Sequence, residues 1–183
     1  MLNNLIGNLL IATPVVFEEP FYRSVILVCS HDKNHAMGLV INKKYNNLSF
    51  KALCKEIGIN HLNSEKNIMI GGPIEITRGF VIHSYENDNS YSYKINGNFS
   101  LSSNIKIIED IASNNGPKKS SIIMGYSGWN AGQLEKEIKS NSWLSLPATD
   151  DLVFSEDYNS TWISSLNKLG IDPIKFSSQY GHA

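Results

Sequence analysis

The spacing of apolar positions along the chain predicts both strands and helices. Residues 24–29 and 36–42 are continuous β-branched and apolar runs separated by a polar, turn-like segment. Such runs predict two adjacent buried strands that form a hairpin. Shorter runs of the same kind at residues 67–73, 78–84 and 120–126 predict further strands, with a turn between the first two that begins at Gly71.

A second hairpin is predicted by the alternating residues 91–101, which are centred on Asn96-Gly97. This pair suits the positive φ angles of a type I′ turn better than almost any other, so a two-residue turn is expected here.

Helices are predicted where apolar residues recur at intervals of three and four. Phe50, Leu53, Cys54 and Ile57 follow this spacing, with Ser49 as the expected N-cap and Gly58 at the end. Similar spacing predicts a second helix from Ile105 to Ala112, capped by Ser102 or Ser103, and a last helix with Trp162, Ile163, Leu166 and Leu169 on one face.

A further helix is expected directly after the segment Gly-Tyr-Ser-Gly-Trp-Asn at residues 125–130. Asn130 is its expected N-cap and Gln133 the capping-box partner. Glu135 and Lys139 are expected to form an exposed i, i+4 pair. Residues 125–130 are therefore interpreted as a strand-to-helix turn, and residues 152–154 as a short strand.

These elements amount to about seven strands and about four helices in mixed order, which favours an α+β fold with a mixed or mostly antiparallel sheet. No linker, repeat or low-complexity segment interrupts residues 1–183, and a chain of this length suits one core. We therefore expect a single compact domain.

Composition narrows the possible partners. Sixteen Lys and Arg residues oppose 17 Asp and Glu residues, for a net charge of −1. Nothing in this balance attracts nucleic acid or anionic lipid, so neither is an expected partner. The apolar runs are too short to cross a membrane and the N-terminus lacks a secretory pattern, so a cytoplasmic location is expected.

Several separated segments carry a family pattern: residues 10–14, 20–21, 23–25, 36–42, 71–73, 78–80, 83–84, 125–135, 143 and 181–183. In this order they resemble the YqgE/AlgH family of bacterial proteins. The resemblance implies a compact mixed α/β fold in a cytosolic protein without established enzymatic activity. The AlgH name refers to a proposed role in the transcriptional regulation of alginate synthesis. No helix-turn-helix pattern supports direct DNA binding here.

Ser127 invites comparison with the G-x-S-x-G nucleophile elbow, in which a serine on a sharp turn faces a histidine base. Trp129 occupies the position of the second glycine of that motif. A glycine is needed there because a neighbouring backbone segment passes close to it. Relatives in the family often have Ala at position 127. A structural turn is therefore the favoured interpretation.

Two glycine segments suggest anion binding as an alternative to packing. The amides of residues 128–131 at a helix start, or Gly71-Gly72-Pro73, are able to face an anion. Asn130 competes as a cap in the first case. In the second, no Gly-Lys-Ser/Thr follows, so a P-loop is excluded and a tight loop between packed elements is favoured.

Cys29, His31 and His35 form a C-x-H-x3-H string that offers three metal ligands. The string lacks a second pair, so we expect no metal site and no cofactor. Cys29 is interpreted as a buried hydrophobic residue, and Trp129, Trp143 and Trp162 as core residues.

The favoured hypothesis is a non-enzymatic binding or regulatory protein whose ligand or protein partner remains unidentified. The expected binding residues are Gly71, Gly72, Arg78, Gly128, Trp129, Asn130 and Glu135. The alternative is a small enzyme that uses His83 as a general base with Cys29 or Ser127.

Overall fold

The computed structural model describes residues 4–86 and 90–179, so the matched segment 181–183 lies outside the described residues. Its strands are β1 (Asn8–Ala12), β2 (Val25–His31), β3 (His35–Val40), β4 (Ile68–Ile70), β5 (Ile74–Ser84), β6 (Tyr93–Lys94), β7 (Phe99–Ser102), β8 (Ser120–Asn130) and β9 (Trp143–Pro147). Its helices are α1 (Phe50–Glu56), α2 (Ile105–Ala112), α3 (Gln133–Lys139), α4 (Asp150–Val153), α5 (Tyr158–Lys168) and α6 (Pro173–Gln179).

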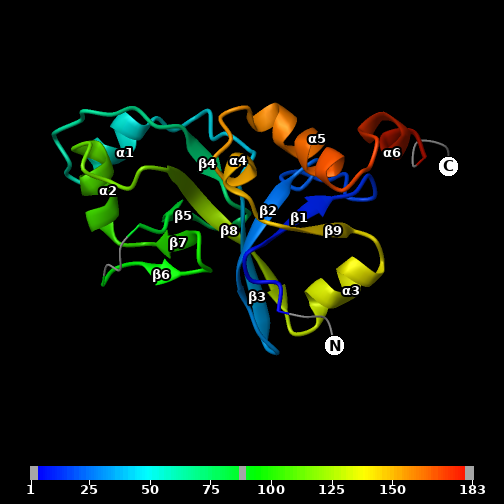
Figure 1. Cartoon of the computed structure of the whole chain (residues 1–183). Coiled ribbons are helices and arrows are strands. Elements are labelled where there is room, and N and C mark those ends of the chain that lie inside the picture. Colours follow the sequence, from blue (N-terminus) through cyan, green and yellow to red (C-terminus); the bar gives the residue numbers. More distant parts are fainter. Residues whose placement is uncertain (1–3, 87–89, 180–183) are drawn as a thin grey trace.

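All nine strands belong to one curled sheet (Figure 1). The strand order is β6-β7-β5-β8-β3-β2-β1-β9, and every neighbouring pair in this order is antiparallel. Strand β4 alone runs parallel to its partner, β8. The predicted α+β class and mostly antiparallel sheet are therefore confirmed, with more strands and helices in the described residues than expected.

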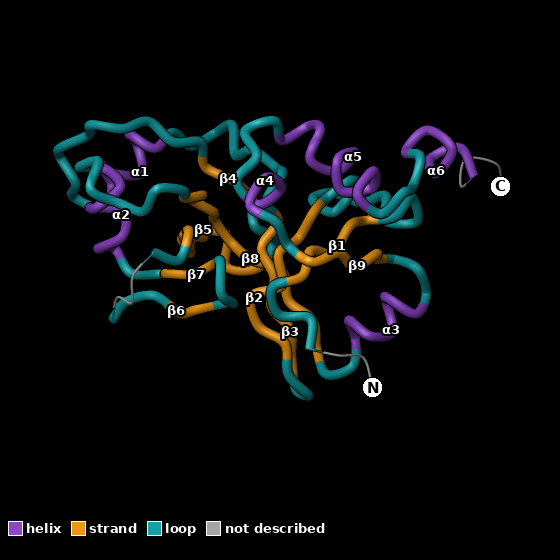
Figure 2. Tube along the Cα trace, viewed as in Figure 1, coloured by secondary structure: helices purple, strands orange, loops and turns teal. Residues whose placement is uncertain are grey.

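Helices lie on both sides of the sheet (Figure 2). Consecutive residues of β1, β2, β4 and β7 are buried, so these strands are covered on both faces. Residues of α4 and α5 pack with alternate residues of β1 and β2 on one face, as Trp162 and Leu27 do. Leu134 of α3 packs with the intervening residues on the other face. A third cluster joins α1 and α2 to β4, β5 and the first half of β8. Two-sided burial explains why the strands form continuous apolar runs in the sequence.

Strands β1 and β9 form an antiparallel pair that the sequence pattern did not predict. The expected strand at residues 152–154 is wrong, because Asp150–Val153 is the short helix α4. Asp150 and Asp151 in its first turn favour a helix N-terminus electrostatically. Leu152 and Val153 remain buried as core residues.

The hairpin between β6 and β7 is confirmed, with Tyr93 opposite Leu101. Its turn differs from type I′, since neither Asn96 nor Gly97 has a positive φ. The Asn96 side chain instead accepts hydrogen bonds from the backbone N–H groups of Asn98 and Phe99, at 2.9 and 3.0 Å. A side-chain-closed turn therefore replaces the expected two-residue one.

The expected strand-to-helix turn at residues 125–130 is also wrong, because these residues are the second half of β8. Gly125 has a φ of 72°, which lets the strand bend without ending. The N-cap of α3 is Gly132 rather than Asn130. Gln133 nevertheless reaches back as in a capping box, since its side-chain oxygen accepts the Asn130 N–H at 3.0 Å.

Among the described residues, no helix combines the length and apolarity needed to cross a bilayer.

Candidate functional site

A cavity of about 500 Å³ lies where the second half of β8 meets β3 and the start of β5. We call it the β3–β8 cavity. Four of the expected binding residues line it: Arg78, Gly128, Trp129 and Asn130. The rest of its wall is Ser30, His35, Ala36, Met37, Ile74, Phe80 and Tyr126. Residues from distant parts of the sequence thus meet in one cavity of a size typical for small-molecule sites.

Arg78 reaches this cavity because β5 loops out before it. Ile74 pairs with Tyr126 and Gly79 with Met124, so five steps along β5 match two along β8. Glu75 takes a positive φ of 45° within this bulge. The Arg78 guanidinium bonds to the Glu75 carboxylate at 2.9 Å and lies 5.2 Å from the centre of the Phe80 ring. Both charged side chains are about half exposed and accessible to a ligand.

Aromatic side chains form the apolar part of the cavity. The rings of Phe80 and Tyr126 meet edge to face with centroids 6.0 Å apart. Gly128 has no side chain to fill this wall, and a Cβ there would lie 3.0 Å from Ile74 Cδ1 and 3.7 Å from Tyr126 Cε2. The cavity therefore combines aromatic walls with the Arg78 charge at its rim.

Gly71 and Gly72 have a packing role. A Cβ on Gly71 would overlap the Gly125 carbonyl oxygen, and one on Gly72 would overlap the backbone of Tyr126. The connection from β4 to β5 crosses the backbone of β8 at this point, and only glycines permit so close an approach. This supports the expected tight loop between packed elements.

Glu135 lies outside the residues that line the β3–β8 cavity. Its carboxylate bonds to His31 Nε2 at 3.0 Å, while His31 Nδ1 accepts the Leu5 N–H at 3.2 Å. The His31 ring therefore carries its proton on Nε2, and this N–H donates a hydrogen bond to the Glu135 carboxylate. Hydrogen bonds, chiefly from the backbone and from His31, lower the pKa of Glu135. The expected pair with Lys139 is replaced by this contact, which ties α3 to β2.

Glu137 is a residue that the sequence analysis missed. Its Oε2 accepts the indole N–H groups of Trp129 at 2.8 Å and Trp143 at 2.7 Å. Its Oε1 accepts the side-chain amide of Gln133 at 2.8 Å. The i, i+4 spacing of Gln133 and Glu137 was the available signal, but the tryptophans come from separate strands. All three tryptophans are buried, which confirms their predicted core packing.

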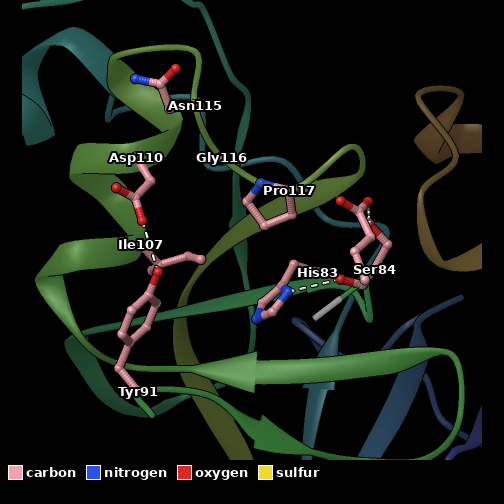
Figure 3. A pocket seen from close by; sticks show the side chains of 9 residues that line it. His83, Ser84, Tyr91, Ile107, Asp110, Asn115, Gly116 and Pro117 are labelled. Atoms are coloured by element: carbon pink, nitrogen blue, oxygen red, sulfur yellow. Dashed lines mark hydrogen bonds between the residues drawn. The ribbon is translucent and has the colours of Figure 1, made fainter. Parts of the chain in front are cut away.

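His83 lines a different cavity, of about 230 Å³, at the far end of β5 (Figure 3). Its Nδ1 lies 3.0 Å from the Ser84 carbonyl oxygen and its Nε2 lies 2.9 Å from Ser92 Oγ. The proton is therefore on Nδ1, and Nε2 accepts the Ser92 hydroxyl. Burial lowers the pKa of His83 and favours the neutral ring.

The same cavity contains a second hydrogen-bonded pair, since the Tyr91 hydroxyl donates to Asp110 Oδ2 at 2.8 Å (Figure 3). This bond raises the pKa of Tyr91. Glu86 accepts the Ser84 hydroxyl at 2.7 Å, which lowers its pKa. Polar groups thus surround the His83 ring.

The structure does not bring His83 together with Cys29 or Ser127. His83 pairs with Ser120 on β8, and Ser127 lies seven residues further along, about 20 Å away at the usual strand rise. The Ser127 hydroxyl donates to the Gly71 carbonyl at 3.0 Å. Cys29 is on β2, three strands from β5, and burial raises the pKa of its thiol to about 12.

The side chains of Cys29, His31 and His35 do not come together around a common point. Cys29 donates to the Leu27 carbonyl, His31 bonds to Glu135, and His35 Nδ1 lies 3.3 Å from Asp32. Within residues 4–86 and 90–179, no three His, Cys, Asp or Glu side chains are grouped to hold a metal ion.

The fold defines a class of α+β protein for which solved relatives exist. The solution structure of the AlgH protein from Pseudomonas aeruginosa matches with a TM-score of 0.80 and 30% identity, covering 100% of this chain and 98% of that one. A protein from Corynebacterium diphtheriae shares the fold at 17% identity, with a TM-score of 0.74 and 97% of each chain covered.

Sequence comparison identifies the family. The AlgH-like family model matches residues 9–174. A UPF0301 protein of Cereibacter sphaeroides is 40% identical over 98% of this chain and 100% of its own length. A UPF0301 protein of Ruegeria pomeroyi has the same identity and coverage. The chain therefore belongs to the AlgH-like family, whose biochemical function is uncharacterised.

Proposed function

We propose that this chain is a cytoplasmic binding protein with a regulatory role, and that its ligand occupies the β3–β8 cavity. The observation that carries the proposal is the convergence of Arg78, Gly128, Trp129 and Asn130 on one cavity of about 500 Å³. Arg78 comes from β5, and the other three residues come from the second half of β8. Convergent polar groups in an apolar pocket are the usual mark of a ligand site.

The lining favours a small molecule with an apolar body and an anionic end. Phe80 and Tyr126 offer aromatic surface, and the Arg78 guanidinium is suited to bind a carboxylate or phosphate in place of Glu75. The regulatory role rests on the family resemblance alone, since the AlgH name refers to a proposed role in transcriptional regulation. A net charge of −1 argues for regulation through a ligand or protein partner rather than through direct contact with DNA.

The proposal is tested with a panel of aromatic and aliphatic carboxylates and phosphates, monitored by thermal unfolding and by changes in Tyr and Trp fluorescence. At least one anion should bind saturably to the natural protein, and Arg78→Ala should weaken this binding about tenfold or more, as expected for a lost charge-assisted hydrogen bond.

The matched control is Lys106→Ala. Lys106 is also an exposed cation paired with a glutamate at i, i+3, but it lies on α2. Each substitution should change the free energy of unfolding by less than about 0.5 kcal/mol. Equal loss of anion binding in both variants would show that general charge, rather than the cavity, is responsible.

A second candidate function, a serine-dependent hydrolase, is favoured by one observation. Ser92 Oγ lies 2.9 Å from His83 Nε2, and the Ser84 carbonyl orients the ring. In such a step Ser92 Oγ attacks an ester carbonyl carbon, its proton passes to His83 Nε2, and the leaving alcohol takes that proton. Water then hydrolyses the acyl-serine. Ser92 replaces Cys29 and Ser127 as the partner of His83.

A fluorophosphonate probe, which reacts with activated serines, separates this candidate from a purely structural hydrogen bond. Labelling at Ser92, established by peptide mass and abolished in both Ser92→Ala and His83→Gln, would support it. An unlabelled protein that hydrolyses none of a set of short-chain esters would refute it.

A further inference from the structure

A second cavity lies against the same stretch of β8, on the side of α3. It has a volume of about 290 Å³ and is lined by Val16, Phe21, Trp129, Glu137 and Trp143, with polar groups from Ser127, Gln133 and Ser142. We call it the indole cavity. It shares Gly128 and Trp129 with the β3–β8 cavity but has different chemistry, because it contains a carboxylate and no basic side chain.

Trp143 lies nearly at right angles to two other aromatic rings in the wall of the indole cavity. Trp129 and Trp143 have centroids 6.2 Å apart and an interplanar angle of 85°. Phe21 and Trp143 have centroids 6.0 Å apart and an angle of 87°. Trp143 is thus nearly perpendicular to both other rings, so the cavity wall presents aromatic faces in more than one direction. Aromatic faces of this kind attract alkylammonium groups in aromatic cages.

The carboxylate of Glu137 adds a fixed negative charge to this aromatic wall. All three of its hydrogen-bond donors are neutral: the indoles of Trp129 and Trp143, and the amide of Gln133. Within the part of the chain that the structure describes, no Lys, Arg or His forms an ion pair with Glu137. The donors hold the carboxylate in place and leave its net charge uncompensated.

A carboxylate accepts about four hydrogen bonds, and three positions are filled here. The remaining lone pair is on Oε1. Glu137 is only partly buried, so a ligand is able to approach it from solvent.

We propose that the indole cavity is a site for a small organic cation, of the alkylammonium class. The aromatic faces of Phe21, Trp129 and Trp143 would contact its apolar and partly charged methyl or methylene groups. The Glu137 carboxylate would supply the counter-charge. This site is separate from the anion proposed for the β3–β8 cavity, and neither proposal depends on the other.

Choline is a suitable probe, and its neutral isostere, in which carbon replaces the quaternary nitrogen, is the matched control ligand. The chain has three tryptophans, so nitrogen–proton correlation spectra show three indole N–H signals. Those of Trp129 and Trp143 should shift saturably with choline. The Trp162 signal should shift much less, because the Trp162 side chain packs in the cluster on the other face of the sheet.

The isostere should bind about tenfold more weakly than choline, since it has the same shape without the charge. Glu137→Gln should weaken choline binding by a similar factor and leave the isostere unaffected. Glu109→Gln, which makes the same charge change on exposed α2, should leave both affinities as they are. Arg78→Ala should also leave choline binding unchanged, which separates this test from that of the β3–β8 cavity.

Equal affinity for choline and the isostere would overturn the proposal, since it would show a purely apolar pocket. So would unchanged Trp129 and Trp143 signals at high choline concentration. Both outcomes are read from the natural protein, so the test remains decisive even if Glu137→Gln weakens the fold.

Discussion

The two halves of β8 differ in their neighbours and in what they contribute. Residues 120–124 lie between β4 and β5, and Ile122 and Ile123 are almost fully buried. Residues 127–130 pair with β3 and border two cavities. The first half has hydrogen-bonded partners on both edges, whereas residues 127–130 no longer pair with β4 or β5 and keep β3 on one edge. One strand thus contributes to the core at one end and lines the β3–β8 and indole cavities at the other.

Gly125 marks the boundary between these halves. It combines a positive φ with close contact to the connection that crosses from β4 to β5. The crossing ends the pairing of β4 on one edge and begins the bulge of β5 on the other. The glycine therefore determines where β8 changes from core strand to cavity wall.

The largest expected effect comes from Gly125→Ala. Its φ is 72°, and a Cβ would lie 2.6 Å from the Gly72 carbonyl oxygen and 3.1 Å from that of Ile74. Left-handed strain and overpacking against backbone should together lower the free energy of unfolding by about 4 kcal/mol in urea denaturation.

Gly132→Ala is the control, because Gly132 has a similar φ of 69° with nothing near its Cβ position. It should cost only about 1 kcal/mol. Similar losses for both variants would mean that the crossing at Gly125 contributes nothing beyond its φ angle.

The next largest effect tests the core half of β8. Ile123 is fully buried, and Ile123→Ala should lower the free energy of unfolding by about 3 kcal/mol through lost burial and the resulting cavity. Ile76, in the bulge of β5, is 60% exposed, so Ile76→Ala should change stability by less than about 0.5 kcal/mol. A large effect of Ile76→Ala on chemical denaturation would show that the bulge is part of the core.

A smaller effect is expected from acidification at the far end of β5. Burial lowers the pKa of His83 below its ordinary 6.5, so the unfolded chain binds this proton more readily than the folded one. The stability contributed by the neutral His83 ring is therefore fully present above pH 6.5. It is lost as the pH falls from 6.5 toward the lower pKa of His83 in the folded protein.

His83→Gln should therefore unfold with a shallower pH dependence than the natural protein in this window, when urea midpoints are compared at several pH values. His35→Gln, at an exposed position, is the matched control and should keep the natural slope. Identical slopes for all three proteins would contradict the inferred titration of His83.

Local signals predicted the elements whose structure depends on neighbours in the sequence. Ser49 accepts the Ala52 N–H and caps α1 as expected. For α2 the predicted cap was one or two residues early, since Asn104 accepts the Lys106 N–H. The β2–β3 hairpin followed from its apolar runs. Strand β1, paired with both β2 and β9, depends on contacts across more than 130 residues that no local pattern encodes.

The candidate site was predictable as a set of residues but not as a place. In a sequence, a glycine such as Gly125 usually indicates a turn. Here the glycine lies inside β8, because the connection from β4 to β5 passes too close for a side chain. Arg78 reaches the cavity only because of the register shift in β5. Glu137 of α3 bonds to two tryptophans on separate strands, and its i, i+4 spacing from Gln133 predicts neither contact.

Strand β8 also determines how the chain is expected to lose its structure. On one side it hydrogen-bonds to β3, which connects it to β2, β1 and β9. On the other part of the sheet it hydrogen-bonds to β4 and β5. If β8 detaches, both parts lose a central partner at once. We therefore expect its buried amides to exchange with solvent only in the globally unfolded state, so that the whole sheet unfolds in one cooperative transition.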